Sequence, residues 1–207
     1  MAFKQFAVQR QLRYSVFPDS PETGKRLIIA LHGYGQLIAF FGKKFENLGT
    51  DFVVVCPEGM HRFYLEGTSG RVGASWMTRE WREQDISENI DALNQLIGTL
   101  VQELKPSQIT VIGFSQGVAT AARWLNKTEI PINKFIAWAG VFPPDLPMDS
   151  TLKLPIEKYA VIGNEDPYFN GEIAHEMISL YSGLGFKIET FDGKHEINQE
   201  LLIRICN

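Results

Sequence analysis

The sequence predicts an α/β protein with a mostly parallel central sheet and helices on both of its faces. Short, continuous apolar runs recur along the chain, which is typical of strands that are covered on both sides. Segments with apolar residues at helical intervals separate these runs, and strands that alternate with helices form parallel sheets through right-handed crossovers. The buried strands are expected at residues 27–31, 52–56, 109–112, 135–138 and 159–162.

Less buried strands are expected towards the two ends of the chain. Residues 6–8 and 12–17 alternate apolar with polar side chains, which predicts a hairpin of two strands at one edge of the sheet. A turn at residues 18–24 separates this hairpin from the first buried strand. Residues 186–191 are expected to form a last, more mixed strand.

Four helices are predicted, at residues 86–104, 116–125, 173–181 and 196–205. The first has a single apolar stripe and ends before Pro106, which cannot continue a helix. The second is rich in small residues, which would let it lie close to the sheet. Two stretches lack clear periodicity and are expected as long loops, which are usually functional or mobile. They are residues 58–81, rich in glycine and aromatic residues, and residues 140–154, rich in proline.

Length and composition are those of an ordinary globular protein, and one domain spanning residues 1–207 is expected. The net charge is −4, and no run of Lys or Arg could follow a phosphate backbone, so nucleic acid is not expected as a partner. With no secretory leader and no stretch of ~20 apolar residues, we expect a cytoplasmic protein without stable membrane insertion. Cys56 and Cys206 lack the spacing of a zinc site or a disulfide framework.

The strongest chemical signal is the pentapeptide Gly113-Phe114-Ser115-Gln116-Gly117, a G-x-S-x-G pattern between a predicted strand and a predicted helix. In such a turn the serine adopts a strained conformation, and glycines two positions before and after it avoid a collision. The pattern predicts Ser115 as a nucleophile. The alternative is an ordinary turn with a surface serine.

A serine hydroxyl becomes a good nucleophile only beside a base, and the chain contains four histidines. His195 follows the last strand and opens onto the C-terminal edge of the sheet, where Ser115 must also lie. His32 directly follows the first buried strand, His61 lies in the irregular stretch, and His175 is expected on the surface of a helix. His195 is therefore the predicted base, and the alternative is that it merely caps the terminal helix.

The acid of the triad is expected between these two residues, because nucleophile turns of this kind occur with the order serine, acid, histidine. Asp166 follows the strand at 159–162 and would hold the imidazole in the correct tautomer. Glu165 is the rival, and Asp166 is preferred for its position in the loop and its shorter side chain. Three other aspartates of this interval follow no strand end so directly, namely Asp145, Asp149 and Asp192.

A tetrahedral intermediate needs two donors for its oxyanion. One is expected to be the backbone N–H of Gln116, at the start of a helix where the dipole also helps. The other is expected in the loop after the first buried strand, on Tyr34, with Gly35 as a close competitor. In the irregular stretch, Phe63, Tyr64, Trp76 and Met77 are candidates for lining a substrate pocket. The alternative is that they only cover the edge of the sheet.

Together these residues make the chain resemble the carboxylesterase/phospholipase branch of the α/β hydrolases, which includes acyl-protein thioesterases. The resemblance covers nearly the whole chain. It rests on Leu31-His32-Gly33-Tyr34-Gly35, Pro57-Glu58-Gly59, Gly113-Phe114-Ser115-Gln116-Gly117, Gly163-Asn164-Glu165-Asp166-Pro167 and Gly193-Lys194-His195-Glu196-Ile197. It implies an α/β-hydrolase fold with a minimal lid or none. The family usually carries Asp after its H-G-x-G phrase, where this chain has Gln36. The segment at residues 36–51 is also short for the family. Both departures bear on substrate preference more than on chemistry.

The expected function is hydrolysis of small-molecule carboxylic esters through an acyl-enzyme on Ser115, as in carboxylesterases and lysophospholipases. No metal, nucleotide or flavin is expected, because the sequence has no phosphate-binding glycine loop and no cluster of ligands. An acyl-protein or acyl-CoA thioesterase is the rival enzyme. A non-catalytic binding protein on the same fold is the rival of another class, and the occupied triad positions argue against it. The sequence does not identify the acyl group, the leaving group or the oligomeric state, and a homodimer is compatible with it.

Overall fold

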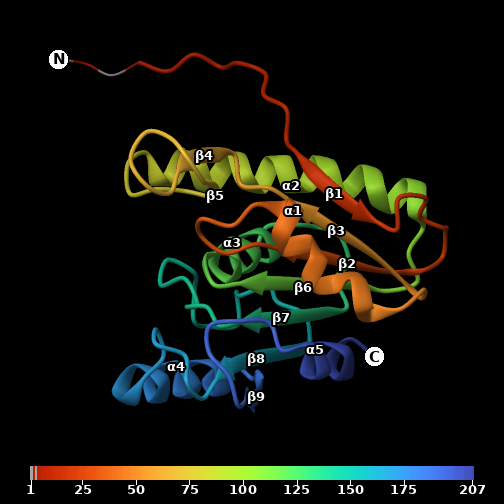
Figure 1. Ribbon diagram of the computed structural model, residues 1–207, viewed down its shortest axis with the longest axis vertical. Helices are drawn as coiled ribbons and strands as arrows, with labels where there is room; N and C mark the ends of the chain where they lie inside the picture. Colours follow the sequence, from red (N-terminus) through yellow and green to blue (C-terminus); the bar gives the residue numbers. More distant parts are fainter. Residues whose placement is uncertain (1, 3) are drawn as a thin grey trace.

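Seven strands form the central sheet in a computed structural model that describes residue 2 and residues 4–207. They lie in the order β1-β3-β2-β6-β7-β8-β9 (Figure 1). All neighbours pair in parallel except β1, which runs antiparallel to β3 at one edge. The bounds are β1 Tyr14–Phe17, β2 Arg26–Leu31, β3 Phe52–Pro57, β6 Ile109–Phe114, β7 Lys134–Trp138, β8 Glu157–Gly163 and β9 Lys187–Phe191. This arrangement confirms the predicted α/β fold class.

Helices cover both faces of this sheet. On one face lie α2 and α3, on the other α1, the 3-10 helix η1 and α5, while α4 lies beside β9. The bounds are α1 Ile38–Phe41, η1 Gly42–Leu48, α2 Arg82–Leu104, α3 Gln116–Leu125, α4 Gly171–Gly183 and α5 Gln199–Cys206. Within the described part of the chain, no helix combines the length and apolarity needed to cross a bilayer.

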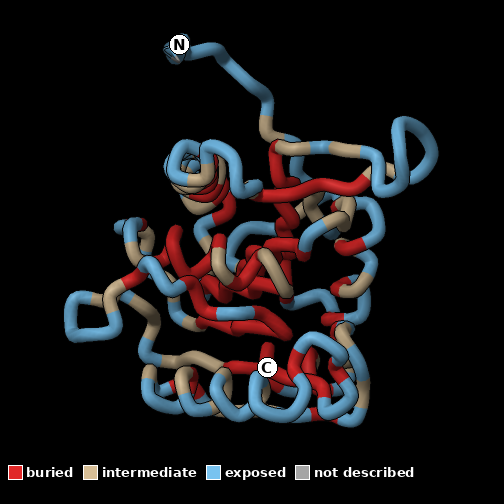
Figure 2. Tube along the Cα trace, turned by 90° about the vertical axis from the view of Figure 1, so that its left-hand side faces the viewer, coloured by how far each residue is buried: buried red, intermediate tan, exposed pale blue. Residues whose placement is uncertain are grey.

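The apolar run of β2 shows how the sequence builds two cores at once. Side chains alternate across a strand, so Leu27, Ile29 and Leu31 join the core under α2 and α3. Ile28 and Ala30 join the core under α1, η1 and α5. All five side chains are at most 1% exposed. Figure 2 shows the buried segments enclosed by exposed ones.

The predicted N-terminal hairpin is wrong in its first strand. Residues 6–8 form no strand, and Phe6 and Val8 are 91% and 80% exposed. β1 instead pairs with β3, with Tyr14 opposite Pro57 and Phe17 opposite Val54. Three alternating residues are too few to specify a pairing partner, whereas β1 can complete the ladder along a long, fully buried strand.

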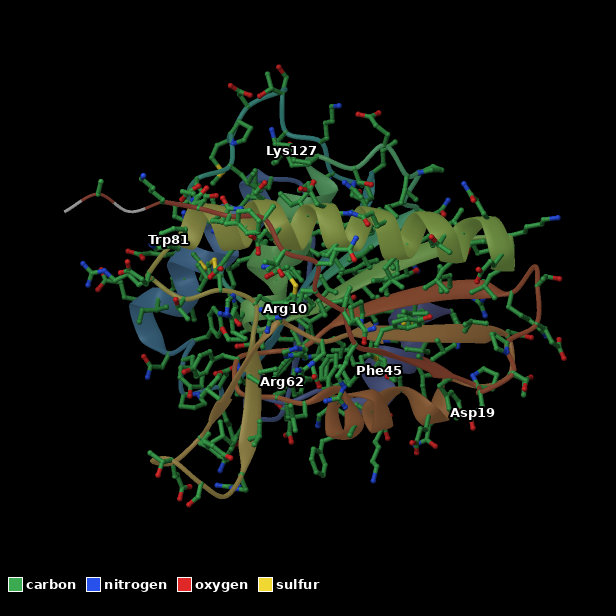
Figure 3. All side chains as sticks on the ribbon, turned by 90° about the horizontal axis from the view of Figure 1, so that it is seen from above. Arg10, Asp19, Phe45, Arg62, Trp81 and Lys127 are labelled. Carbon is green, nitrogen blue, oxygen red and sulfur yellow. The ribbon has the colours of Figure 1, made fainter. Side chains whose placement is uncertain are left out.

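The stretch at 58–81 is not the irregular loop that its composition predicts. It contains β4 (His61–Tyr64) and β5 (Val72–Ser75), which pair in antiparallel fashion as a separate small sheet. Figure 3 shows this hairpin, with Arg62 on its first strand, extending away from the central sheet. Gly67 and Gly70 both have positive φ in its turn, a conformation that favours glycine. The stretch at 140–154 has no helix or strand, as expected.

Replacing Ile97 by Ala should lower the free energy of unfolding by about 2–5 kcal/mol, because Ile97 of α2 is fully buried and the change leaves a cavity. Ile156, which is 97% exposed, offers the same substitution without a cavity, and its effect should stay within about 0.5 kcal/mol. Urea unfolding followed by circular dichroism measures both. Similar losses for the two variants would contradict the packing described above.

Candidate active site

Ser115 lies in the tight turn between β6 and α3, in a strained backbone conformation. Its φ is 54° and its ψ is −118°, a region that residues other than glycine rarely occupy. The backbone N–H of Ser115 donates to the carbonyl of Trp138 at 2.9 Å, which ties the turn to the end of β7. The strain is therefore held in place by the surrounding sheet.

The flanking glycines are required by close backbone approaches. A Cβ at Gly113 would lie 2.6 Å from the carbonyl oxygen of Gly117, and a Cβ at Gly117 would lie 2.2 Å from that of Leu31. A third glycine, Gly140, would place a Cβ 2.4 Å from the carbonyl oxygen of Ser115. Glycine at these positions lets α3 start directly against the ends of β2 and β7. The serine is thus presented at the C-terminal edge of the sheet.

The imidazole of His195 and the carboxylate of Asp166 are in direct contact. The Nδ1 of His195 lies 2.7 Å from the Oδ2 of Asp166. The other oxygen of Asp166, Oδ1, accepts the backbone N–H of Tyr168 at 2.9 Å, and the residue is 2% exposed. A buried carboxylate at this distance holds a proton on Nδ1, which leaves Nε2 as the basic nitrogen.

Two aromatic rings hold the imidazole of His195. Phe114, which is buried, lies with its ring centroid 4.9 Å from that of the imidazole. Tyr168 approaches edge-on, with its centroid at 4.7 Å. These contacts restrict rotation of the imidazole, so its orientation depends on packing as well as on Asp166.

The other candidates for acid and base lie elsewhere. Glu165 is exposed and does not line the cavity that contains Ser115. His61 contacts Asp85 at 3.0 Å, at the start of β4, and His175 is exposed on α4. Among the four histidines, only His195 lines the same cavity as Ser115.

His32 is fully buried, and the backbone engages both of its ring nitrogens. Nε2 accepts the N–H of Gly59 at 2.9 Å, so Nδ1 carries the proton and donates to the carbonyl of Gly33 at 2.7 Å. Trp76 stacks on the ring, with centroids 5.0 Å apart. Burial lowers the pKa of His32, against smaller opposing effects of the Gly33 hydrogen bond and the Glu58 carboxylate. His32 is a neutral, structural histidine.

Hydrogen bonds in the turn at residues 33–36, after β2, leave one N–H without an acceptor. The N–H of Gly33 donates to Oε1 of Gln36 at 2.9 Å, and the N–H of Gln36 donates to the carbonyl of Gly33 at 3.2 Å. The N–H of Gly35 donates to the carbonyl of Ala74 at 2.8 Å. Among the residues that the structure describes, only Tyr34 in this turn has an N–H without an acceptor. This favours Tyr34 over Gly35 as a donor to a bound ligand.

β5 supports both this turn and the start of α3. A Cβ at Gly73 would lie only 2.6 Å from the carbonyl oxygen of Gly35, so the two segments touch through their backbones. The side-chain amide of Gln116 receives the N–H of Trp76 at 3.1 Å and donates to the carbonyl of Met77 at 3.1 Å. The sequence offers little sign of these side-chain contacts, because they depend on a hairpin that its pattern did not predict.

The four predicted pocket residues are placed elsewhere, and this corrects the sequence-based interpretation. Trp76 is buried against His32, and the ring of Phe63 packs on that of Tyr34, with centroids 5.0 Å apart. Met77 faces Arg123, and Tyr64 is 48% exposed. None of the four lines the cavity at Ser115. Their segment forms a hairpin that contacts the turn at Gly35 and the side chain of Gln116, and it does not form a loop that covers the cavity.

The cavity at Ser115 has a volume of about 510 Å³. Its lining combines aliphatic or small residues (Ala119, Ala139, Gly140 and Val141) with the aromatic residues Tyr34, Phe114, Tyr168 and Phe169. His195 also lines it, and no Asp, Glu, Lys or Arg of the described chain does. A larger groove of about 840 Å³ lies between residues 4–12 and α2, but its described lining contains no serine, cysteine or histidine. Of these two hollows, the cavity at Ser115 contains the predicted nucleophile and base, and it has no charged lining residue.

A mostly parallel sheet, with a strained serine and a histidine–aspartate pair at one cavity by its C-terminal edge, is the arrangement of an α/β hydrolase. The model of the phospholipase/carboxylesterase family matches residues 16–206. The chain belongs to this family, and it is an enzyme of the carboxylic ester hydrolase class.

Solved structures agree on the fold. The chain is similar to a carboxylesterase from Mesorhizobium loti, with a TM-score of 0.71, 12% identity and 93% of each chain covered. It is similar to acyl-protein thioesterase 2 from Zea mays, with a TM-score of 0.68, 18% identity, and 94% of this chain and 96% of that chain covered. For the Bacillus cereus carboxylesterase the TM-score is 0.66 at 16% identity, covering 93% of this chain and 91% of that one. Among curated proteins, no sequence matches this chain significantly.

The buried His32 predicts a pH dependence of stability. Its folded pKa is lowered, so the unfolded chain binds a proton near pH 6.5 that the folded chain takes up only at lower pH. The stabilisation is complete above this pH and is lost as the pH falls towards the folded pKa. Urea unfolding between pH 7.5 and 5.5 should show stability falling by up to about 1.4 kcal/mol per pH unit from this group.

Two variants isolate that contribution. His32→Gln should flatten the slope of unfolding free energy against pH, whereas His175→Gln, at an exposed position, should retain the parent slope. Equal slopes in the parent and in His32→Gln would contradict the assignment.

Proposed function

We propose that Ser115, His195 and Asp166 form a catalytic triad that hydrolyses carboxylic esters through an acyl-enzyme. The observation that carries this proposal is the 2.7 Å contact between His195 and Asp166 beside a cavity that Ser115 also lines. The strained turn at Ser115 supports it, because a binding protein on the same fold would have no need of such a serine.

The proposed acylation uses these three residues. Nε2 of His195 takes the proton of the Ser115 hydroxyl as Oγ attacks the ester carbonyl. The carbonyl becomes an oxyanion, which accepts hydrogen bonds from the backbone N–H groups of Tyr34 and Gln116. When the tetrahedral intermediate collapses, the bond to the alcohol breaks, and the alcohol oxygen receives the proton from His195. Asp166 stays ionised throughout and stabilises the imidazolium.

Deacylation repeats these steps with water. His195 removes a proton from water, whose oxygen attacks the acyl carbon, and the same two N–H groups hold the second oxyanion. The carboxylic acid leaves as the proton returns to Oγ of Ser115. Every group required for both halves belongs to the residues already described.

The substrate class that we propose is an uncharged small-molecule ester. A cavity of about 510 Å³ with a largely apolar and aromatic lining and no carboxylate or ammonium group favours a neutral acyl portion near Ser115. Thioester hydrolysis, as in an acyl-protein or acyl-CoA thioesterase, would use the same atoms with a thiolate as the leaving group. Comparing kcat/KM for matched oxygen esters and thioesters with acyl chains of increasing length separates these two activities.

A fluorophosphonate probe should label the parent protein and leave Ser115→Ala unlabelled, because the probe reacts with an activated serine hydroxyl. Ser107→Ala, at an exposed position outside the cavity, should be labelled as fully as the parent. Gel fluorescence after a fixed labelling time measures the outcome. Equal labelling of Ser115→Ala and the parent would remove Ser115 as the nucleophile.

Asp166→Asn should lower kcat for an activated ester by about three to four orders of magnitude, because an amide favours the wrong imidazole tautomer. Glu165→Gln, the same chemical change in the preceding and exposed residue, should leave kcat within about twofold. Steady-state kinetics on both variants checks the prediction. The reverse ranking would transfer the role of the acid to Glu165.

A further inference from the structure

Gln36 follows the H-G-x-G phrase, where its carboxamide meets the backbone of the turn that it closes. Its Oε1 accepts the N–H of Gly33 at 2.9 Å, and its own N–H donates to the carbonyl of Gly33 at 3.2 Å. The amide atom that faces a backbone N–H must be the oxygen, so the hydrogen bond fixes the orientation of the carboxamide. Residues 33–36 are therefore joined at their ends by two hydrogen bonds in opposite directions.

We propose that Gln36 is a positioning residue, whose side-chain oxygen holds this turn in the shape that presents the N–H of Tyr34 to the oxyanion. The inference rests on the proposed function, in which Tyr34 supplies one of the two donors. It assigns to Gln36 a role in kcat that requires no contact between its side chain and the substrate.

The geometry of the peptide bond links the backbone N–H of Gln36 to the direction of the Tyr34 N–H. In a trans peptide the carbonyl of one residue and the N–H of the next point in opposite directions. The carbonyl of Gly33 accepts hydrogen bonds from Nδ1 of His32 and from the N–H of Gln36. Because these two donors fix where the Gly33 carbonyl points, they direct the N–H of Tyr34 the opposite way, where it has no acceptor.

The side-chain oxygen of Gln36 is the only hydrogen-bond acceptor of the Gly33 N–H among the described residues. Gly33 is buried, and a buried N–H without an acceptor is unfavourable. The carbonyl of the same peptide, that of His32, accepts Nε1–H of Trp76 at 2.8 Å. Without Oε1, the Gly33 N–H would therefore stay without an acceptor, or the peptide would rotate against that bond. At Gly35, the hydrogen bond from its N–H to the carbonyl of Ala74 holds the turn independently of Gln36.

Gly33 also packs against Ser115, so a rotation of the Gly33 backbone would change its contact with the nucleophile. A Cβ at Gly33 would lie 3.0 Å from Cβ of Ser115 and 3.3 Å from Oε1 of Gln36. The carboxamide, the turn and the serine are therefore packed around one point. A small rotation at Gly33 would move the Tyr34 donor relative to the carbonyl that Ser115 attacks, and such displacements strongly affect the rate of the chemical step.

The test uses three changes at Gln36 and one matched control. Gln36→Met removes the acceptor and keeps the length of the side chain, and Gln36→Asn keeps the amide but shortens the side chain by one methylene, which draws the acceptor back from Gly33. Gln36→Glu keeps an acceptor at the original length. Gln199→Met is the control, because the Gln199 side chain also bonds the backbone, donating to the carbonyl of Lys44 at 2.8 Å, and Gln199 does not line the cavity, whereas Gln36 does.

Two measurements are made on each variant: steady-state kinetics on an activated ester, and amide hydrogen exchange of Gly33 by NMR. For Gln36→Met and Gln36→Asn we expect kcat to fall about 10- to 100-fold while KM changes less than about threefold. Exchange of the Gly33 N–H should accelerate by at least about tenfold. Gln36→Glu should keep Gly33 exchange near the parent rate and have a higher kcat than Gln36→Met and Gln36→Asn. Gln199→Met should have the kcat and the Gly33 exchange rate of the parent.

The outcomes separate this inference from the proposed function. A parent protein without esterase activity would overturn the proposed function, while Gly33 exchange would still report whether Gln36 holds the turn. If the parent is active and Gln36→Met keeps kcat within about twofold, Gln36 is not a positioning residue. If kcat falls with Gly33 exchange unchanged, Gln36 contacts the substrate directly, and the positioning role is also overturned.

Discussion

The close contact of α3 with the ends of the parallel strands is the constraint on which the site depends. Gly117 brings the first turn of this helix against the carbonyl of Leu31, at a distance that no Cβ would permit. Because of this approach, Ser115 has no relaxed conformation available and is turned out at the edge of the sheet. Every other part of the site is then placed relative to a helix that cannot move away.

Much of the fold and the chemical centre can be predicted because each element has a local cause in the sequence. Apolar runs fix the buried strands, and parallel strands bring their C-terminal ends to one edge, so Ser115, Asp166 and His195 are expected to meet although 80 residues separate the first from the last. The contact between His195 and Asp166 agrees with this reasoning. The rest of the assignment remains a prediction until activity is measured.

Features that depend on a weakly patterned partner could not be predicted. In 58–81 the first strand of the hairpin carries the charged Arg62, the second consists of Val and small residues, and a long turn separates them, so no clear alternation is visible. Without that hairpin, the directions in which the side chains of Phe63 and Trp76 point cannot be predicted. Phe63 lies in β4 and Trp76 directly follows β5, and side-chain direction depends on the face of a strand that a residue occupies. The hydrogen bond from the Gly33 N–H to the Gln36 side chain could not be predicted either, because it depends on the shape of the turn at residues 33–36.

The attachment of two separate segments to β5 has a consequence for how substitutions combine. Ala74 holds the turn that contains Tyr34, and the residues just after it hold the side chain of Gln116. The two proposed donors therefore share one support although they come from distant parts of the chain. Energetic effects of substitutions in these two segments should not be additive, because loosening one segment through β5 already disturbs the other.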